Sequence, residues 1–388
     1  MKKAIIWGAG RFGVCAFDFY REKYNIVCFV DSNPSKVGNY VEGKRVASPE
    51  VLRTFEGIVI VASKFNSEGI VDKLWNQYCQ KDICIFSVKQ ELVDNRDTSG
   101  FSLLDSISIR LSGGLGNQMF QYALLCALKE QGKKVYVRNM NHPDKLIITK
   151  VFPNVIFDEI TKEDEERILS FNIEEDEPNR IISYYKENMR NGIEKRADKK
   201  VLEIDTGVIQ GLFQTAYFAE TVKETIKKNY TFPKISNTQI SEIIQRITIG
   251  NSVSVHIRRG DYLSQYNEYI YNNICTEAYY QKAIELIRTK VSNPVFFVFS
   301  NNIQEAQQIL FGTDVVYFDG ATISDYEDWY DMYLMTQCKH NIIANSTFSW
   351  WGAWLNQNED KIVIAPSKWT NTFDYKDVYP DGWTIIEG

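Results

Sequence analysis

The sequence is poor in the residues that build metal sites, disulfide frameworks and membrane spans. It has only 3 histidines, no DxD triplet and no CxxC pair. Its 7 cysteines are scattered along the chain and odd in number, which indicates neither a zinc site nor a disulfide framework. No run of 18 apolar residues occurs, so no segment is a candidate for a transmembrane helix.

Charge and targeting signals exclude further classes. The net charge is −6 and the pI is about 5.4, which is not typical of a nucleic-acid groove or of a surface that binds anionic membranes. The start, MKKAIIWG, reads as a short strand that runs into a glycine turn, and it is too short for a signal peptide. We therefore expect a cytoplasmic protein.

The overall composition is that of a folded, water-soluble protein. Apolar residues make up 44% and charged residues 24%, and a chain of 388 residues suits two or three domains. Aromatic residues make up 13%, a high share that would suit stacking on sugar or base rings, although most such rings belong to cores.

Residues 1–98 predict a small Rossmann-like domain. Strands are expected at 4–7, 26–30, 58–62 and 83–86, with helices up to about residue 23 and near 66–79. Gly8, Gly10 and Gly13 follow the first strand, and Asp31 lies about 20 residues further on, as in the dinucleotide fingerprint. The same turn also serves helix–strand packing, so binding of NAD or another nucleotide here is an alternative that we do not favour.

A second unit follows a polar linker at 90–105. A strand is expected at 107–111, then the string GGLGNQ at 113–118, a helix over 119–131 ended by Gly132, and a strand at 135–137. The glycine-rich string lacks the Lys-Ser/Thr ending of a P-loop. Amides at a helix start could still hold an anion, and the side chains of Asn117 and Gln118 could bind sugar hydroxyls.

The most informative stretch is SVSVHIRRGDY at 252–262. Val253, Val255 and Ile257 alternate with polar residues, which predicts a strand with one apolar face. His256 and Arg258 then leave the other face at the carboxyl end, where ligands bind in α/β folds. Because guanidinium groups hold phosphate oxygens in a bidentate manner, this end indicates a site for a phosphorylated ligand.

Residues 250–388 alternate strands with helices and predict a doubly wound parallel sheet. Strands are expected at 295–299, 315–318, 341–344 and 361–365, and helices at 277–289, 303–310, 325–338 and from about 345. Polar loops lie at 256–261, 300–302 and 345–349. The last places Ser346, Thr347 and Ser349 at a helix start, where hydroxyls add to free amides.

The chain resembles the family-11 α-1,2-fucosyltransferases in three strings that occur in the same order. They are GGLGNQMFQY at 113–122, HIRRGDY at 256–262 and NSTFSWWG at 345–352, and LFQ at 212–214 adds to them. The resemblance covers about 106–388. It implies a GT-B-like pair of Rossmann-type halves, with the acceptor side at 106–245 and the donor side at 250–388. It also implies an inverting transfer of L-fucose from GDP-β-L-fucose to the 2-hydroxyl of a terminal galactoside, as in the synthesis of bacterial surface glycans such as O-antigen, with no metal or other cofactor.

The resemblance assigns residues to the two substrates. His256 would lie beside the ribose or phosphates, and the acceptor would meet Gln214 and Tyr262. The catalytic set would be Arg258, Asp261 and His256. The donor would contact Gly114, Leu115, Gly116, Asn117, Gln118, Arg258, Asp331, Asn345, Ser346, Thr347, Phe348 and Ser349, with Asp331 against guanine.

The general base stays open at this point. Asp261 is the first candidate by position, and Glu268 is the second. Two other classes of function also stay open. One is an NAD-dependent oxidoreductase built on the turn at 8–13, and the other is a non-catalytic regulator that binds a nucleotide sugar.

Overall fold

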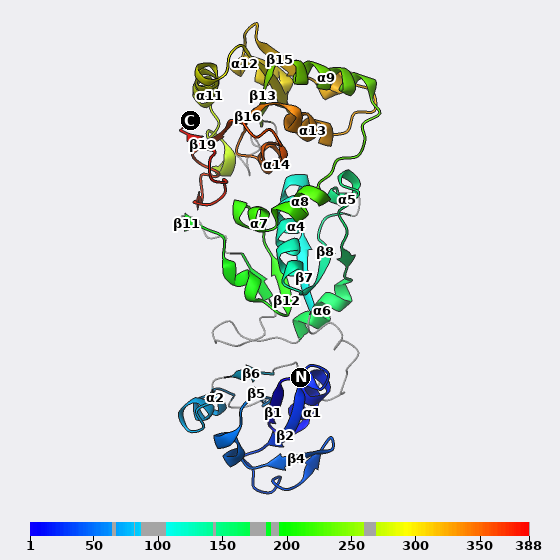
Figure 1. The fold of residues 1–388 in the computed structure, drawn as a ribbon, viewed down its shortest axis with the longest axis vertical. Helices are drawn as coiled ribbons and strands as arrows, with labels where there is room; N and C mark the ends of the chain where they lie inside the picture. The colour runs from blue at the N-terminus through cyan, green and yellow to red at the C-terminus, as the bar shows by residue number, and fades with distance from the viewer. Residues whose placement is uncertain are drawn as a thin grey trace.

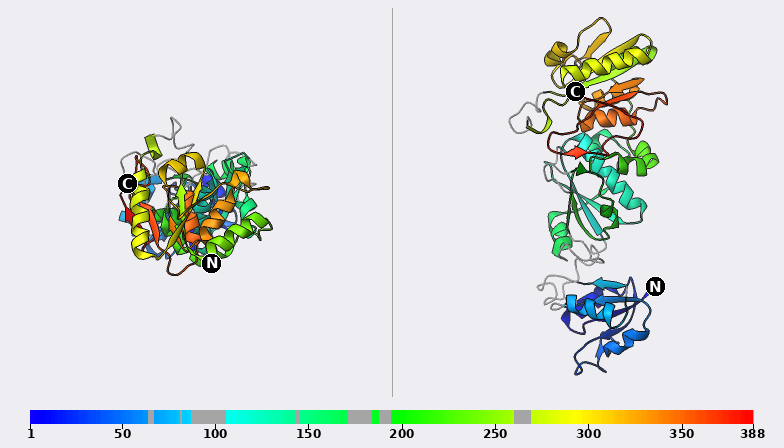
Figure 2. Two further views of the ribbon diagram at one scale, coloured as in Figure 1. Left: turned by 90° about the horizontal axis from the view of Figure 1, so that it is seen from above. Right: turned by 90° about the vertical axis from the view of Figure 1, so that its left-hand side faces the viewer.

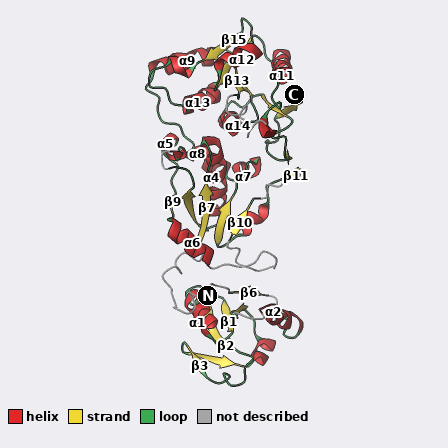
Figure 3. Cartoon of the chain, turned by 180° about the vertical axis from the view of Figure 1, so that it is seen from behind, coloured by secondary structure: helices red, strands yellow, loops and turns green. Residues whose placement is uncertain are grey.

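The computed structural model describes residues 1–63, 67–80, 82–86, 106–142, 145–170, 184–187, 194–259 and 269–387. Three large sheets follow one another in chain order along the long axis of the molecule (Figure 1). Helices flank the strands of each unit, as the view from behind also shows (Figure 3). The predicted fold class, a GT-B-like pair of Rossmann-type units preceded by a smaller one, is confirmed.

The N-terminal sheet has the order β3-β4-β2-β1-β5-β6. Its strands are β1 (Lys3–Trp7), β2 (Asn25–Val30), β3 (Tyr40–Val41), β4 (Lys44–Ala47), β5 (Ile58–Val61) and β6 (Ile83–Ile85). Alternate residues of β1 face opposite sides, so Ile6 packs under α1 (Arg11–Tyr20) and Ile5 on the side of α2 (Ser67–Asn76). Both core clusters consist of residues from this unit alone.

The second sheet has the order β10-β12-β7-β8-β9 and is parallel. Its strands are β7 (Ser106–Leu111), β8 (Lys134–Asn139), β9 (Asp158–Glu159), β10 (Tyr184–Lys186) and β12 (Gly207–Gln210). Its helices are α4 (Leu115–Glu130), α5 (Ile148–Val151), α6 (Lys162–Ser170), α7 (Ala216–Thr221) and α8 (Lys223–Asn229).

Helix α4 starts at Leu115, four residues before the predicted start. Gly114 is its N-cap and has an extended backbone. The Gly-Asn-Gln string suggested a loop, but Leu115 is only 6% exposed and Gln118 is fully buried. Packing of these residues outweighs their weak helix propensity.

The third sheet has the order β15-β14-β13-β16-β17-β19, again parallel. Its strands are β13 (Asn251–Ile257), β14 (Pro294–Ser300), β15 (Val315–Phe318), β16 (His340–Ile342), β17 (Val363–Pro366) and β19 (Thr384–Ile386). Its helices are α9 (Thr238–Ile249), α11 (Glu277–Lys290), α12 (Ile303–Ile309), α13 (Trp329–Gln337) and α14 (Thr347–Leu355).

Strand β13 lies inside the third sheet and is covered on both faces. Val253, Val255 and Ile257 pack against α11 in one core, as the alternation predicted. The opposite face is polar but is also buried. Its polar groups find partners there, since Ser254 Oγ accepts a 2.7 Å hydrogen bond from Asn341 Nδ2. The strand therefore has an apolar face and a hydrogen-bonded polar face, both away from solvent.

Two predicted limits differ from the structure. We placed 106–245 on the acceptor side, but Ile240 and Ile247 of α9 pack with Phe297 and Leu334 of the third sheet's unit, so the chain crosses over before Thr238. We also expected a helix from 325, whereas α13 starts at Trp329, and Asp325 itself has a φ of 52°, which is incompatible with a helix.

The second and third units share one core. The rings of Trp350 and Trp351 of α14 lie 4.6 and 4.9 Å from that of Phe120 of α4 in tilted arrangements, and all three side chains are fully buried. The segment after β17 returns to the second unit, where β18 (Asp374–Tyr375) pairs with β11 (Glu194–Lys195). Figure 2 shows from a second side that the second and third units adjoin and that the N-terminal unit lies apart from them.

Candidate active site

The end of β13 brings an imidazole and a guanidinium together. His256 is only 4% exposed, and its ring lies 6.0 Å from that of Phe348 in the first turn of α14. Burial, with the charge of Arg258, lowers the pKa of His256 to about 3. A neutral imidazole of such low basicity suits a hydrogen bond to a ligand better than proton abstraction. Its Nδ1 is bonded to none of the described residues.

The turn after β13 is held by Asn301, a member of the polar loop at 300–302 to which no role was assigned from the sequence. Arg259 N donates a 2.8 Å hydrogen bond to Asn301 Oδ1, and Asn301 Nδ2 donates back to Arg259 O at 2.9 Å. Asn301 lies in the polar loop that follows β14. This pair ties the ends of two neighbouring strands together and so fixes the backbone from which Arg258 projects.

The first turns of α4 and α14 are in contact. A Cβ placed on Gly116 would lie 2.6 Å from the backbone carbon of Thr347 and 2.8 Å from Phe348 N, so only glycine fits there. Trp351 Nε1 also donates a 3.0 Å hydrogen bond to Gly116 O. Amides of a helix's first turn have no intrahelical partner and carry a partial positive charge. The contact therefore concentrates positive potential between the two halves.

The string at 113–118 divides into exposed and buried members. Gly113 and Gly114 are exposed, and Leu115 is buried in the shared core. The amide of Gln118 is fully used, because Nε2 donates to Gly113 O and Lys145 O while Oε1 accepts from Ile147 N and Ile148 N. Donor binding by Gln118, which stays a prediction, would require those bonds to break.

The loop at 345–349 divides in the same way. Asn345 Nδ2 donates to Tyr271 O and Trp369 O, and the fully buried Ser349 hydroxyl donates to Ser346 O at 3.2 Å. These two side chains hold the loop. Ser346 is the N-cap of α14, but its side chain accepts no capping hydrogen bond, and Thr347 is partly exposed. Ser346 and Thr347 are therefore the better placed hydroxyls for an anion.

Asp331 lies in the first turn of α13, on the side of β15. Its Oδ1 accepts a 2.5 Å hydrogen bond from the hydroxyl of Tyr326, whose ring packs on Gly320 just after β15. Burial raises the pKa of Asp331 to about 7, while the bond from Tyr326 opposes the rise. The family resemblance implies that Asp331 contacts guanine, and Tyr326 is a partner of Asp331 that no sequence motif indicated.

The order of the strands indicates how long a ligand must be to contact Asp331, Arg258 and the start of α14 at the same time. Helix α14 follows β16, Arg258 follows β13, and Asp331 lies near the end of β15, so the groups are spread over the order β15-β14-β13-β16. Three strand spacings amount to about 14 Å. An extended nucleoside diphosphate, with its base near Asp331 and its phosphates near α14, fits such a row.

Several predicted site residues lie outside the described part of the chain. Asp261, the first candidate base, and Glu268, the second, are among them, as is Tyr262. Their roles stay predictions. Within the described ranges, no group of three or more His, Cys, Asp and Glu side chains is arranged to hold a metal ion.

A cavity of about 560 Å³ lies elsewhere, between α8, α13 and α14. Tyr333, Gln337 and Asn356 are among its lining residues, and none of the predicted site residues lines it. It lies at the C-terminal end of α14, whereas the predicted donor residues at 345–349 lie at the N-terminal end, about 13 Å away along a helix of nine residues. We therefore do not assign the substrates to it.

In the N-terminal unit, the glycine turn is used for packing. A Cβ on Gly13 would lie 1.8 Å from Gly8 O, and one on Gly8 would lie 2.3 Å from Ala62 O. The Asp31 carboxylate accepts from Ala9 N at 3.0 Å and from Lys36 Nζ at 2.8 Å. These bonds occupy the acid that would bind a ribose, so the geometry does not strengthen the NAD alternative.

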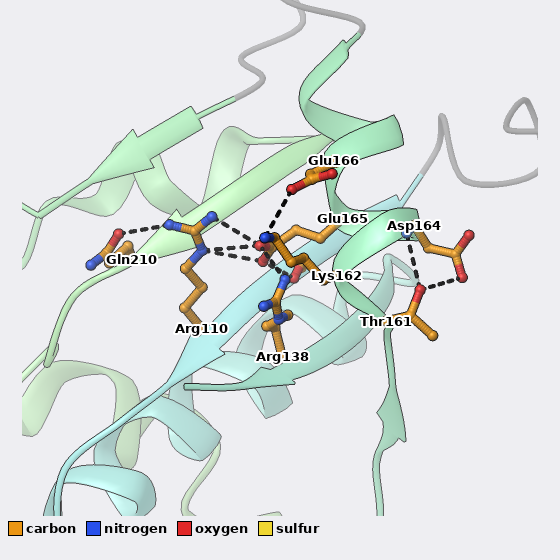
Figure 4. A network of polar contacts seen from close by, with 9 residues as sticks. Arg110, Arg138, Thr161, Lys162, Asp164, Glu165, Glu166 and Gln210 are labelled. Atoms are coloured by element: carbon orange, nitrogen blue, oxygen red, sulfur yellow. Dashed lines mark hydrogen bonds and ion pairs between the residues drawn. The ribbon is translucent and has the colours of Figure 1, made fainter. Parts of the chain in front are cut away.

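A buried carboxylate network anchors α6 to the second sheet (Figure 4). Glu165 is 1% exposed, and its oxygens accept hydrogen bonds from Arg110 at 2.9–3.3 Å and from Arg138 at 3.2 Å. Gln210 and Ser108 complete the network. Its side chains are engaged with one another across α6 and three neighbouring strands, which indicates a structural role.

Comparison with known proteins decides the family. The model described as "Glycosyl transferase family 11" matches residues 76–387, most of the chain. The chain belongs to this family. Residues 1–84 match a second model, "C2185-like, N-terminal". The family-11 chain is therefore a glycosyltransferase with an additional N-terminal domain. In its described part, no helix has the length and apolar character needed to span a membrane.

Three curated relatives illustrate the range of the family. The chain is 33% identical over 309 residues to an Escherichia coli protein named alpha-1,2-colitosyltransferase, which covers 72% of this chain and 98% of the relative. It is 29% identical to the E. coli O-antigen biosynthesis glycosyltransferase WbnK, over 70% and 98% of the two chains. It is 26% identical to galactoside alpha-(1,2)-fucosyltransferase 1 of Lagothrix lagotricha, over 68% and 69%.

Among solved structures, the fold is similar to a family-9 glycosyl transferase from Veillonella parvula DSM 2008. That match has a TM-score of 0.39 and 11% identity, and it covers 73% of this chain and 87% of the other.

Proposed function

We propose that the chain transfers L-fucose from GDP-β-L-fucose to the 2-hydroxyl of a terminal galactoside, with inversion, during the synthesis of a bacterial surface glycan. Membership of glycosyl transferase family 11 supports the transfer of a sugar. The names of the relatives support an α-1,2 linkage, an O-antigen context and a deoxygenated hexose of the fucose type. The proposal includes a cytoplasmic location and no requirement for a metal ion or NAD.

The contact between the starts of α4 and α14 is the observation that carries the nucleotide-sugar site. Two helix N-termini held together repel each other unless an anion lies between or beside them. The tight packing at Gly116 and the shared tryptophan core enforce that contact. A diphosphate would relieve the repulsion, and Arg258, at the end of the adjacent strand, would add a bidentate guanidinium.

The proposed mechanism follows from the charges that develop. As the bond between C1 of the sugar and the phosphate oxygen breaks, positive charge grows on the sugar ring and negative charge on the diphosphate. Arg258 and the helix-start amides stabilise the diphosphate. The acceptor hydroxyl attacks C1 from the opposite face and gives its proton to a base, for which Asp261 is our first candidate. The low pKa of His256 favours a role in binding rather than in proton transfer.

A second donor is favoured by one specific comparison. The relative named alpha-1,2-colitosyltransferase is 33% identical to this chain. Colitose is L-fucose without its 3-hydroxyl, so the two GDP-sugars place the same groups on the phosphate and guanine contacts. They differ by one hydrogen-bonding group at the sugar.

A donor panel tests the proposal. The protein would be incubated with a terminal galactoside and, in separate reactions, GDP-fucose, GDP-colitose, GDP-mannose and UDP-galactose, and kcat/KM would be measured for each. We expect GDP-fucose to give the highest value and UDP-galactose none. A higher value for GDP-colitose would replace the proposed donor sugar, and exclusive use of a UDP-sugar would reject the guanine assignment.

The same assay separates the other two classes of function. An oxidoreductase would consume NADH with a carbonyl substrate and would leave all nucleotide sugars intact. A non-catalytic regulator would bind GDP-fucose without releasing GDP in the presence of any galactoside. Either result would reject the transferase proposal.

A further inference from the structure

Gln214 joins three segments of the two halves. Its Nε2 donates a 2.8 Å hydrogen bond to Asn117 Oδ1 in the first turn of α4. Its Oε1 accepts a 2.9 Å hydrogen bond from Trp369 Nε1, which lies beyond β17 in the third unit. Gln214 is only 8% exposed. The orientation of the Asn117 amide, beside the exposed glycines 113 and 114, therefore depends on where Gln214 is held.

The turn that carries Gln214 has a strained backbone. Phe213 has a φ of 50°, in the left-handed region that bulky residues rarely adopt. Thr215 N donates to Phe213 O at 2.8 Å, a tight turn of three residues. Such a conformation persists where its surroundings enforce it, and it occurs often at functional sites. The structure must therefore contain groups that hold this turn.

Glu187 is one of the groups that hold it. Its Oε2 accepts hydrogen bonds from two consecutive amides of the turn, Leu212 N at 2.8 Å and Phe213 N at 3.1 Å. Hydrogen bonds to a carboxylate are stronger than those to a neutral acceptor. A Cβ on Gly211 would lie 2.5 Å from Glu187 Cβ, so the strand end and the acid are closely packed.

A second residue of the same strand supports the ring of Phe213. Tyr185 of β10 stacks on it at 6.3 Å with an angle of 24° between the planes. Tyr185 and Glu187 are two residues apart and so leave the strand on one side. Edge strand β10 thus contacts both the ring and the amides of the strained turn.

We propose that Glu187 is a positioning residue of the transferase site, which holds the turn at 212–214 so that Gln214 orients Asn117 toward the hydroxyl-rich acceptor. The proposal thus assigns Asn117 to the acceptor and not to the donor, with which the family resemblance grouped it. This inference rests on the proposed function for the identity of the acceptor. Glu187 itself lies one residue beyond β10, at the carboxyl end of the second sheet, where substrates bind in α/β folds. Its effect reaches the acceptor through the turn and Gln214.

Two substitutions at this position separate positioning from proton transfer. In Glu187→Gln, the amide oxygen can still accept from both backbone amides, so we expect kcat and both KM values within about threefold of the wild type. In Glu187→Ala, both amides lose their acceptor and the turn relaxes. We expect the KM for the acceptor to rise by about 10-fold or more while the KM for the donor stays unchanged.

Glu159→Ala is the matched control, because Glu159 is an exposed acid in β9, at the other edge of the same sheet. It should match the wild type. Binding of GDP, measured by calorimetry, shows that each variant is folded, and binding of the galactoside to each is measured in the same way without any donor.

Three outcomes would overturn the proposal. A loss of kcat of about 100-fold or more in Glu187→Gln at an unchanged acceptor KM would make Glu187 a general base. An acceptor affinity of Glu187→Ala equal to that of the wild type would show that the turn needs no carboxylate. A fall in kcat of Glu187→Ala with both KM values unchanged would place the effect of Glu187 in the transition state and not in acceptor binding. If the wild type neither binds nor fucosylates any galactoside, the proposed function fails, whatever the variants do.

Discussion

At the scale of single residues, Arg258 has the largest part in the proposed chemistry. It follows the buried strand β13 and is close enough to lower the pKa of His256. Loss of one preorganised group of this kind costs about 100- to 1,000-fold in kcat. We expect Arg258→Ala to lose at least about that much, and Arg258→Lys to recover little, because an ammonium cannot form the bidentate fork.

Steady-state kinetics with a saturating donor check this expectation. Arg288→Ala is the matched control, since Arg288 is half exposed and pairs with Asp314 at 2.7 Å on the surface. The control should keep wild-type kcat. If Arg258→Ala remained active, other groups would have to stabilise the negative charge on the diphosphate. If wild-type activity were lost in EDTA and restored by Mn²⁺ or Mg²⁺, a metal ion would supply that stabilisation.

The ionisation of Asp331 predicts a pH dependence of donor binding. Guanine can donate two hydrogen bonds to a carboxylate but not to the protonated acid, and burial raises the pKa of Asp331 to about 7. The KM for GDP-fucose should therefore rise as the pH falls through about 7. Tyr326 lowers this pKa through its hydrogen bond, so Tyr326→Phe should shift the profile to higher pH.

Asp331→Asn is the control for this pH series, since its side chain does not titrate in that range. Its donor KM should be high and nearly constant between pH 6 and 8. If the donor KM of the wild type did not change with pH over the same range, Asp331 would not be the residue that binds guanine.

At the scale of elements, the attachment of α6 depends on one buried carboxylate. Glu165 serves two arginines, and each arginine side chain is about 20% exposed. Removing one partner of a buried ion pair costs about 3–5 kcal/mol, because the remaining charge stays desolvated. Glu165→Ala should lower the stability of the second unit by about that amount, measured by urea unfolding.

The next residue provides a matched control for that measurement. Glu166 faces solvent and lies 3.7 Å from Lys162, with both side chains more than half exposed (Figure 4). Glu166→Ala should change stability by less than about 1 kcal/mol. Equal effects of the two substitutions would contradict the structural role of the network.

Elements with a clear period were predicted well. The apolar alternation predicted β13 and its buried face, β15 was predicted with its observed limits, and α11 was predicted to within a residue. The short strands β9, β10 and β11 were missed, because two or three residues show no period of their own, whereas the equally short β6 was found inside the apolar run at 83–86. The start of α4 was wrong, since contacts with α14 decide it rather than local propensity.

The candidate site was predicted as a set of strings, but not as individual contacts. Gln118, Asn345 and Ser349 could be assigned to a candidate ligand site from the sequence, because polar residues at strand ends suggest a ligand. The sequence could not show that their side chains are already bonded within the chain. Glu187 and Tyr326 were missed because their importance comes from tertiary partners, a strained turn and a buried carboxylate.

At the scale of the whole molecule, the second and third units form one body and the N-terminal unit stands apart. The largest core contains residues of α4 and α14 together, whereas the cores of the N-terminal unit contain residues of that unit alone. A chain that starts at Ser99 should therefore fold and keep transferase activity.

Turnover of GDP-fucose by this shortened chain, compared with the full chain at equal concentration, checks that expectation. Circular dichroism and a sharp thermal transition would establish that it is folded. A folded, soluble chain from Ser99 with no turnover would mean that the N-terminal domain contributes to the active site.

The linkage of the product tests the central claim most directly. Wild-type protein would be incubated in EDTA with GDP-fucose and an acceptor that ends in galactose, and the purified product would be examined by two-dimensional NMR. The account predicts one new α-fucosyl residue whose anomeric proton correlates with C2 of the galactose. A β-configured fucose, or attachment at any other galactose carbon, would contradict it.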